Sequence, residues 1–300
     1  MAQDWLEISV QVDGEGAEAV SEVFNRYGRG GAVVEHLLLD GLGAHDGVDE
    51  LRVKTYIPAG DEAIKTRIAH ALWHLGQLYP IPEPVYRVLV EADWAEAWKS
   101  HYSVLHTGRR TVIVPQWLSY DAAPGEVVIT LDPGMAFGTG THPTTRLCLE
   151  LLEEAIVPGM RVLDLGTGSG VLAIAAAKQG AAEVLAVDVD ELAVAAAREN
   201  AAANGVAGAV QVEGGSLDRA AGRYHLILVN ILAEVICALL DGGLAEALEP
   251  GGVVIASGII DEREPAVRAA MAAHGIELTG RRTERDWVAL QGARLAGSGG

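Results

Sequence analysis

The segment from Val162 to Gly170 has the residue types and spacing of a turn that binds a nucleoside. An apolar run leads there into three glycines at alternate positions, Gly166 to Gly170, and an apolar stretch suited to a helix begins at Val171. Glycines let the backbone approach a ligand closely, and the first turn of a helix has N–H groups without partners in the helix. Asp188 follows Gly166 by 22 residues, at the end of the next expected strand. A carboxylate there can accept hydrogen bonds from both hydroxyls of a ribose.

The spacing of the glycines separates the ligand classes that such a turn could bind. A dinucleotide turn reads G-x-G-x-x-G, and its third glycine would have to stand at Val171. A phosphate-binding loop that ends in Gly-Lys-Ser/Thr is excluded because that ending is absent. G-x-G-x-G after a strand that carries Asp164 resembles the turn of S-adenosylmethionine-dependent methyltransferases. We therefore expect S-adenosylmethionine as the cofactor; the alternative is a tight turn that binds no ligand.

A second segment, Phe137 to Thr145, is suited to binding the carboxylate of that cofactor. Pro143 fits the first position of a helix, with His142 or the residue before it as the cap. Thr144 and Thr145 then lie in the first turn, where N–H groups and hydroxyls can bind a carboxylate. A single loop histidine beside a cap is more often local structure than a catalytic base, so we assign no role to His142.

A third segment begins at Asn230, which closes the fourth strand of the expected parallel sheet. Ligands of such sheets bind beyond the carboxyl ends of the strands, so Asn230 is placed where a methyl group and its acceptor would meet. Many enzymes that methylate planar nitrogens have Asn/Asp-Pro-Pro-aromatic at this point. This chain has Ile231, Leu232 and Ala233 instead. The departure argues against nucleobase and side-chain-amide acceptors and leaves flexible amines open.

The first ninety residues are predicted to fold as a ferredoxin-like α+β unit, because strand and helix patterns follow one another in the order β-α-β-β-α-β. His70 and His74 could share a helix face as metal ligands, but no third ligand stands nearby, and an ordinary helix face is the better interpretation. The expected strands are 5–12, 31–39, 51–57 and 85–90, with a turn at 40–49, and the expected helices are 16–27 and 61–78.

From Arg161 onward, strands alternate with helices, which predicts an α/β domain with a doubly wound, Rossmann-like parallel sheet. Residues 109–114 and 126–130 before it are predicted to form an antiparallel pair. The expected domains are 1–90, a helical connector at 91–106, a methyltransferase domain at 107–295 and a disordered tail at 296–300. The expected strands of the large sheet are 161–165, 183–188, 210–213, 225–230 and 252–257, followed by a hairpin of 276–283 and 287–294 at its edge.

The composition limits the partners. Forty-one acidic and 22 basic residues give a formal net charge of −19, which disfavours a nucleic-acid substrate and favours a basic protein, although many enzymes are acidic only for solubility. Cys148 and Cys237 form no disulfide framework or metal-ligand spacing, so we interpret both as buried thiols of a cytoplasmic protein. No apolar run is long enough to cross a membrane. The oligomeric state is left open.

Taken together, these segments resemble the PrmA family, the methyltransferases of large-subunit ribosomal protein eleven at the stalk base. The resemblance rests on the loop from Phe137 to Thr145, the glycine turn and Asn230-Ile231-Leu232. Trp94, Trp98, the segment 257–260 and Trp287 also stand where the family has them. The resemblance implies that the amino-terminal domain grips the substrate, and that its α-amine and lysine side chains are methylated. The cofactor-binding residues we expect are Phe137, Thr144, Thr145, Gly166, Thr167, Gly168, Asp188 and Asn230, with Asn230 also in the catalytic role.

Two other functions remain open from the sequence alone. A methyltransferase of small-molecule amines would need the same motifs but would not need the amino-terminal domain. A non-catalytic sensor of S-adenosylmethionine or a ribosome-assembly factor would not need the complete set of motifs. None of the Asp, Glu or His side chains in the three segments is an evident strong base, so we expect positioning to supply most of the catalysis.

Overall fold

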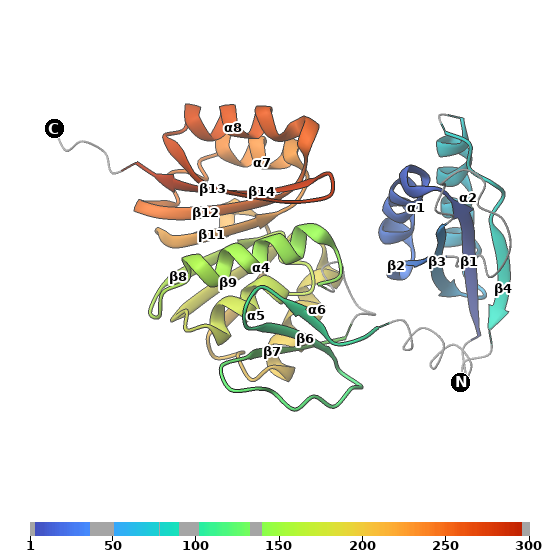
Figure 1. Ribbon diagram of the computed structural model, residues 1–300, viewed down its shortest axis with the longest axis horizontal. Helices are drawn as coiled ribbons and strands as arrows, with labels where there is room; N and C mark the ends of the chain where they lie inside the picture. The colour runs from blue at the N-terminus through green and yellow to red at the C-terminus, as the bar shows by residue number, and fades with distance from the viewer. Residues whose placement is uncertain (1–3, 37–50, 78, 90–101, 133–139, 296–300) are drawn as a thin grey trace, which may run out of the picture. The chain divides into compact units, whose positions relative to one another are not determined.

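The computed structural model describes residues 4–36, 51–77, 79–89, 102–132 and 140–295 (Figure 1). The chain divides into two compact units, Met1–Ser103 and Val104–Gly300. The predicted turn at 40–49, most of the predicted connector and the predicted tail lie outside the described residues.

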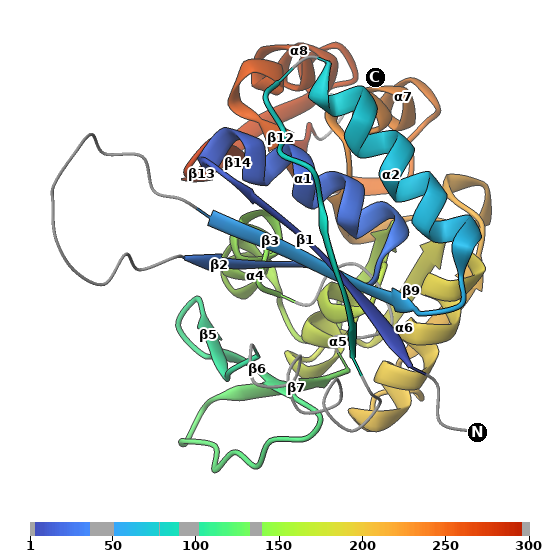
Figure 2. The same ribbon diagram turned by 90° about the vertical axis from the view of Figure 1, so that its right-hand side faces the viewer.

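The first unit is a four-stranded antiparallel sheet with two helices on one face (Figure 2). The strand order β2-β3-β1-β4 confirms the predicted ferredoxin-like arrangement. Alternate side chains of β1, from Leu6 to Val12, face the helices and form the core with Phe24 and Ile68. The elements are β1 (Trp5–Val12), α1 (Gly14–Tyr27), β2 (Arg29–His36), β3 (Leu51–Pro58), α2 (Glu62–Gly76) and β4 (Val85–Leu89).

Both helices of this unit begin at an aspartate cap. Asp61, the first residue of the predicted helix 61–78, is the cap of α2, and its carboxylate accepts a hydrogen bond from the Ile64 N–H at 3.0 Å. Asp13 does the same for the Gly16 N–H at 2.9 Å, so α1 begins two residues before the predicted start. The Tyr79 hydroxyl donates to the other oxygen of Asp13 at 2.5 Å, and this bond lowers the pKa of the Asp13 carboxyl.

The second unit is a seven-stranded sheet of order β10-β9-β8-β11-β12-β14-β13, in which the first five strands are parallel (Figure 1). The predicted doubly wound sheet and its edge hairpin are confirmed, since β14 pairs antiparallel with both β12 and β13. The strands are β8 (Arg161–Leu165), β9 (Glu183–Asp188), β10 (Val210–Gly214), β11 (Tyr224–Asn230), β12 (Leu248–Ile260), β13 (Ile276–Glu284) and β14 (Trp287–Arg294).

Helices cover both faces of this sheet. Val162 of β8 belongs to the apolar core under one helix layer, and Leu163 and Leu165 belong to the core under the other. This two-sided burial explains why the strands are apolar at nearly every position. The first layer contains α4 (Pro143–Ala155), α5 (Val171–Lys178) and α6 (Glu191–Ala203); the second contains α7 (Ala233–Asp241) and α8 (Glu264–Ala273).

A separate three-stranded sheet corrects two predictions. β6 (Thr111–Pro115) and β7 (Val127–Leu131) pair in parallel, so the predicted antiparallel pair is wrong. The antiparallel partner of β6 is β5 (Leu105–Thr107), which occupies residues assigned to the helical connector. The reason is chain geometry: the turn at Gly108, with φ +63°, is tight enough for a hairpin, and residues 116–126 are long enough to carry the chain back for parallel pairing.

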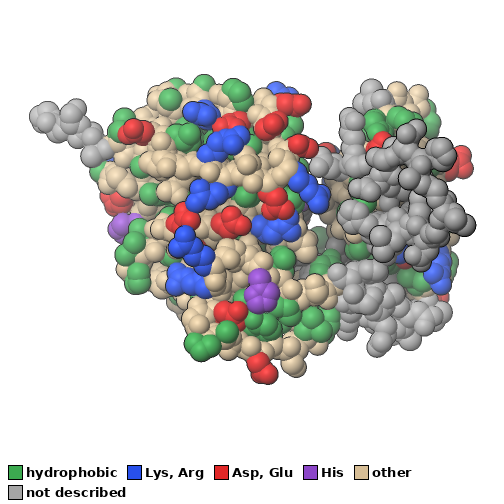
Figure 3. Space-filling view, viewed as in Figure 1, with side chains coloured by type: hydrophobic (Ala, Val, Ile, Leu, Met, Phe, Trp, Pro, Cys, Tyr) green, Lys and Arg blue, Asp and Glu red, His purple; other side chains and the backbone are tan. Residues whose placement is uncertain are grey.

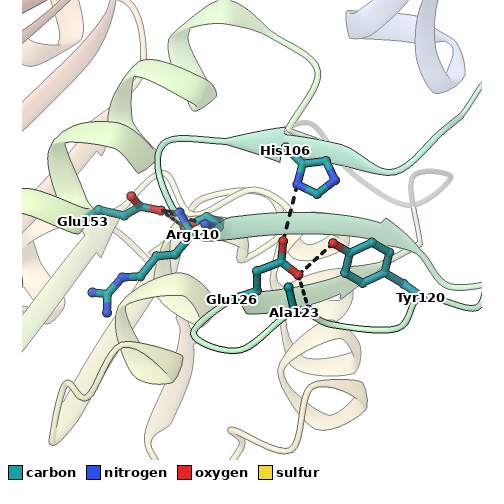
Figure 4. A network of polar contacts seen from close by, with 7 residues as sticks. His106, Arg110, Tyr120, Ala123, Glu126 and Glu153 are labelled. Carbon is teal, nitrogen blue, oxygen red and sulfur yellow. Dashed lines mark hydrogen bonds and ion pairs between the residues drawn. The ribbon is translucent and has the colours of Figure 1, made fainter.

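A carboxylate of α4, Glu153, closes the turn between β5 and β6 (Figure 4). It accepts hydrogen bonds from the N–H groups of Arg109 (2.8 Å), Arg110 (3.2 Å) and Thr111 (2.8 Å), and from the Thr111 hydroxyl (2.5 Å). Burial alone would raise the pKa of Glu153, but these hydrogen bonds outweigh it and hold the pKa below its ordinary value. The small sheet is thereby joined to α4.

A second carboxylate orders the connection from β6 to β7. Glu126 accepts hydrogen bonds from the Tyr120 hydroxyl at 2.8 Å and from the Ala123 N–H at 2.7 Å (Figure 4). The imidazole of His106 lies 3.8 Å from the other oxygen of Glu126. The long connection is therefore ordered by local hydrogen bonds.

Replacing Glu153 by Gln should loosen the β5–β6 turn, because an amide presents one acceptor oxygen and sets an NH₂ group against backbone donors. We expect the free energy of unfolding of the second unit to fall by about 1–3 kcal/mol. The contribution of Glu153 is present above its ordinary pKa of 4.5 and is lost as the pH falls through the lowered folded value. Urea unfolding at pH 7 and pH 3, with hydrogen exchange of residues 105–115, measures it. Glu199→Gln, exposed on α6, is the control, and equal behaviour of the two variants would contradict the role.

Candidate active site

The glycine turn, Asp188 and Asn230 meet at the carboxyl ends of the strands of the large sheet, where the strand order reverses. β8 lies between β9 and β11, and all three strands are parallel. The turn that begins at Gly166, the carboxylate of Asp188 and the amide of Asn230 therefore stand at neighbouring strand ends. This is the topological switch point, at which open α/β sheets bind their ligands.

All three glycines of the turn have a backbone conformation that favours glycine, and two of them also make room for a neighbouring residue. All have positive φ: +72° at Gly166, +55° at Gly168 and +83° at Gly170, which L side chains rarely adopt. A Cβ on Gly166 would lie 2.6 Å from Ile231 Cγ2, so this glycine makes room for a side chain of the β11 end. A Cβ on Gly170 would lie 3.2 Å from the Cα and Cβ of Ala197, so this glycine lets α6 pack closely.

Asp188 lies at the carboxyl end of β9, and its carboxylate also stabilises the glycine turn. Its Oδ2 accepts a hydrogen bond from the Gly168 N–H at 2.9 Å, and its Oδ1 accepts one from the Asp190 N–H at 3.0 Å. The residue is half-buried, and each carboxylate oxygen has a further lone pair. Asp188 can therefore hold the turn and bind two hydroxyl groups at once.

Asp164 is a site residue for which the sequence suggested no role. Its Oδ2 accepts hydrogen bonds from the Thr167 hydroxyl at 2.6 Å and from the Ala173 N–H at 3.1 Å, which joins β8, the turn and α5. Burial raises the pKa of Asp164 to about 7, although these two hydrogen bonds oppose the shift. Within the described residues its Oδ1 has no hydrogen-bond partner. An Asp one position before the strand end was the signal that could have identified it.

The first turn of α4 reaches the end of β11. His142 caps the helix, since its Nδ1 accepts a hydrogen bond from the Thr144 N–H at 3.3 Å. Thr144 and Thr145 are both buried, and the Asn230 amide donates to the Thr145 hydroxyl at 3.3 Å. The structure therefore places Thr145 beside Asn230 and Thr144 against His142, whereas Phe137 lies outside the described residues.

His142 is unsuited to act as a base at neutral pH. Burial, with a contribution from the Arg146 guanidinium, lowers the pKa of His142 to about 4, although Glu284 opposes the shift. The imidazole packs edge-on against the ring of Trp287, with 4.9 Å between the ring centroids. Arg146 in turn forms a two-point ion pair with Glu284. These contacts favour the predicted interpretation of His142 as local structure.

A glycine of β12 confines the segment that follows Asn230. Gly258 has φ +84°, and a Cβ there would lie 2.7 Å from the carbonyl carbon of Ile231 and 3.0 Å from its nitrogen. The Ile231 N–H also donates to the Ser257 carbonyl at 3.1 Å. Ile231 is therefore confined, with its side chain against Gly166 and its backbone against Gly258.

Asn200 of α6 and Asn204, which caps the carboxyl end of that helix, connect the glycine turn to the small sheet, and the sequence gave no reason to select them. The Asn200 amide donates to the Ser169 carbonyl at 2.9 Å. Asn204 accepts from the Thr130 N–H at 2.9 Å and donates to the Thr130 carbonyl at 2.6 Å, as a neighbouring strand would. The edge of β7 is thereby joined to the turn. The Asp132 N–H, which begins the segment toward Phe137, lies 3.5 Å from Asn200 Oδ1.

Other features of the described residues do not coincide with this site. A cavity of about 550 Å³ is lined by Glu264, Pro265, Arg268 and Arg281, and the Glu264 carboxylate already pairs with both arginines. The face in Figure 3 shows basic and acidic side chains interleaved over the second unit, in keeping with pairs such as Arg282 and Glu154.

In the ranges that the structure describes, no three His, Cys, Asp or Glu side chains are grouped to hold a metal ion. No described helix is long and apolar enough to cross a membrane.

The fold and the site define the class of this protein. A doubly wound sheet carries the glycine turn after its central strand, and the third glycine serves helix packing. The neighbouring strand ends supply a carboxylate and an amide. The second unit is a Rossmann-like methyltransferase domain, and a ferredoxin-like unit precedes it.

The comparisons identify the family. The sequence profile of the family "Ribosomal protein L11 methyltransferase (PrmA)" matches residues 4–295. The chain is 49% identical to the protein of that name from Chloroflexus aurantiacus, over 95% of this chain and 97% of the relative. It is 46% identical to the one from Herpetosiphon aurantiacus, with 95% and 98% covered. The solved structure of a ribosomal protein L11 methylase from Lactobacillus delbrueckii subsp. bulgaricus superposes with TM-score 0.61 at 38% identity, covering 65% of this chain and 100% of that one.

This chain belongs to the ribosomal protein L11 methyltransferase family. It is a methyltransferase, and S-adenosylmethionine is its methyl donor.

Gly258→Ala should impair methyl transfer, because the added Cβ would push Ile231 and with it Asn230. We expect turnover to fall by about tenfold or more, since displacements of about 1 Å are costly in oriented reactions. Gly275→Ala is the matched control, with φ +71° and no atom within 4 Å of the added Cβ. The control should lose about 1–2 kcal/mol of stability from backbone strain and keep its turnover. Turnover with radiolabelled cofactor measures both, and normal turnover in folded Gly258→Ala would contradict the positioning role.

Proposed function

We propose that this protein transfers methyl groups from S-adenosylmethionine to amines of ribosomal protein L11, both the terminal α-amine and lysine side chains. The observation that carries the proposal is the match over residues 4–295, which includes the glycine turn, Asp188 and Asn230, to a family whose relatives are named for that substrate. The proposed location is the cytoplasm, because ribosomal proteins are assembled into ribosomes in that compartment.

The site residues fit this cofactor. The turn of Gly166, Thr167 and Gly168 accommodates the nucleoside, and Asp188 takes the ribose hydroxyls. Thr144, Thr145 and Phe137 hold the methionine part, and Asn230 borders the transferring methyl group. When bound, the cofactor supplies a methyl group on a cationic sulfonium. The buried carboxyl of Asp164, whose Oδ1 has no partner among the described residues, favours a positively charged ligand over an anionic one.

The acceptor nitrogen must be neutral to attack the methyl group. At pH 7, deprotonation costs a lysine of pKa 10.4 about 4.6 kcal/mol and an α-amine of pKa 7.8 about 1.1 kcal/mol. Asn230 orients the lone pair, and desolvation lowers the pKa of the amine. His142 is already neutral. Asp164 has a pKa of about 7, but it is buried and its Oδ2 is occupied by Thr167 and Ala173, so we assign it to the turn.

Recognition of L11 is assigned to the first unit. Residues 1–90 are proposed as the substrate-binding domain and the residues from 91 up to β5 as the connector. The methyltransferase domain is proposed to extend from β5 to residue 295, because β5 pairs with β6. A protein substrate gives a reason for a separate folded unit that carries none of the cofactor residues. The net charge of −19 suits a basic partner and disfavours direct binding of nucleic acid.

Asp188→Ala should weaken cofactor binding by about 2–3 kcal/mol, because hydrogen bonds to a charged group are lost and the Gly168 N–H loses its acceptor. Titration calorimetry with S-adenosylmethionine measures the change. Glu191→Ala is the control, since it removes an equal charge from an exposed position three residues away. Equal affinities for Asp188→Ala and wild type would overturn the ribose assignment, and equal losses in both variants would reduce it to a general electrostatic effect.

The pH dependence tests the proposed reaction with purified L11. At saturating cofactor and limiting L11, methylation of lysine should rise nearly tenfold per pH unit through neutrality, and methylation of the α-amine should level off near pH 8. Each acceptor is tested alone, with the terminus blocked for the lysine reaction, in single-turnover mode so that chemistry limits the rate. No methylation of either acceptor would overturn the proposal. Coincident plateaus near pH 7 would show a general base, with Asp164 rather than His142 as the residue to test.

A further inference from the structure

Exposed aliphatic side chains gather at the two turns that flank the glycine turn. Val189 and Leu192 follow β9 and are 82% and 73% exposed, while Leu232 and Val235 follow β11 and are 61% and 44% exposed. These four are among only seven large hydrophobic side chains that are exposed in the described part of the second unit. Single exposed aliphatics need no explanation, but a concentration beside a ligand site marks a binding surface.

Leu232 and Val235 serve neither the core nor the helix that they begin. Leu232 precedes α7 and Val235 lies in its first turn, where the Val235 N–H donates to the Leu232 carbonyl at 3.0 Å, so the two residues are close together at the start of the helix. The buried residues of that helix are Ala233, Ile236 and Leu240. Leu232 occupies the N-cap position, where a side chain that accepts a hydrogen bond is preferred, and it makes no capping bond. Local structure therefore gives no reason for an exposed leucine here.

The position of Leu232 is set by the residues before it. Asn230 ends β11 beside Thr145, and Ile231 is confined between Gly166 and Gly258. Leu232 follows directly, so its side chain is carried on the segment that borders the transferring methyl group. Leu232 and Val235 thus continue the site on its acceptor side, whereas Val189 and Leu192 lie on the ribose side, next to Asp188.

The charge around this apolar pair is negative. The turns 188–191, 230–235 and 258–263 carry one basic residue, Arg263, which pairs with Glu234 at 3.3 Å. An apolar strip with an acidic surround suits a ligand that has a long hydrocarbon stem and a cationic end, which describes a lysine side chain. The acidic residues of these turns are Asp188, Asp190, Glu191, Glu234, Asp261 and Glu262.

We propose that Leu232 and Val235 form the wall against which the methylene stem of the acceptor lysine packs. An α-amine is bonded directly to Cα and has no such stem, so the pair favours lysine acceptors over the terminal amine. This inference rests on the proposed function, in which both kinds of amine are methylated at this site.

The test compares both acceptors in one reaction. Wild type, Leu232→Ser and Leu232→Met are incubated with S-adenosylmethionine and limiting L11, and mass spectrometry of the terminal and lysine-containing peptides gives kcat/KM for each. Leu232→Ser should lower the lysine value about tenfold and change the α-amine value by less than about twofold, and Leu232→Met should restore most of the loss. Val157→Ser is the matched control. Val157 is also exposed, but it precedes β8 and so lies near the amino ends of the parallel strands, away from the site at their carboxyl ends.

The outcomes separate this inference from the proposed function. A selective loss of lysine methylation, with unchanged cofactor affinity by calorimetry, supports the wall. An equal loss for both acceptors, or no loss for either, overturns it while the wild-type reaction still supports methylation of L11. Failure of the wild type to methylate any lysine would overturn the proposed lysine activity and this inference together.

Discussion

The hydrogen bond from the Gly168 N–H to Asp188 is the interaction on which the site depends, because it ties the turn after β8 to the end of β9. The same turn is limited on its other side by Ile231, whose side chain occupies the space that a Cβ on Gly166 would need. A turn of positive-φ glycines has little conformational preference of its own. Contacts from both neighbouring strands therefore decide its shape, and any ligand at this edge meets three strands at once.

The polar groups behind the turn make it rigid at some energetic cost. Asp164 is buried, and burial raises its pKa to about 7, yet its hydrogen bonds to Thr167 and Ala173 join three consecutive elements. The Asn200 side chain joins α6 to the turn by donating a hydrogen bond to the Ser169 carbonyl. Buried polar groups stabilise one geometry when their partners are in place, so this cluster favours a single conformation of the turn. The apolar core alone would not select it.

Particular elements show how far the sequence was sufficient. Asp188 and Asn230 could be predicted at the same end of the sheet because the carboxyl ends of parallel strands lie together, and the periodicity indicated those strands, but only the structure shows that β8 lies between them. The pairing of β6 and β7 was predicted with the wrong direction, because periodicity gives the strands but not their partners. Part of the predicted helical connector is strand β5 for the same reason, since Gly108 and Glu153 decide that hairpin. Asn204 was missed because its partner, Thr130, is distant in the sequence.

The sequence by itself determined the class of this protein, since the glycine spacing, the placed Asp188 and the loop before Pro143 are local patterns that need few other contacts to be interpreted. The tertiary structure decided what each of these residues does. It gave Gly170 a packing role against Ala197 and made Asp188 a support of the turn. It also kept His142 neutral by burying it beside Arg146. The physical reason is that hydrogen-bond partners, burial and pKa depend on residues brought together from distant parts of the chain, and local patterns carry no record of those neighbours.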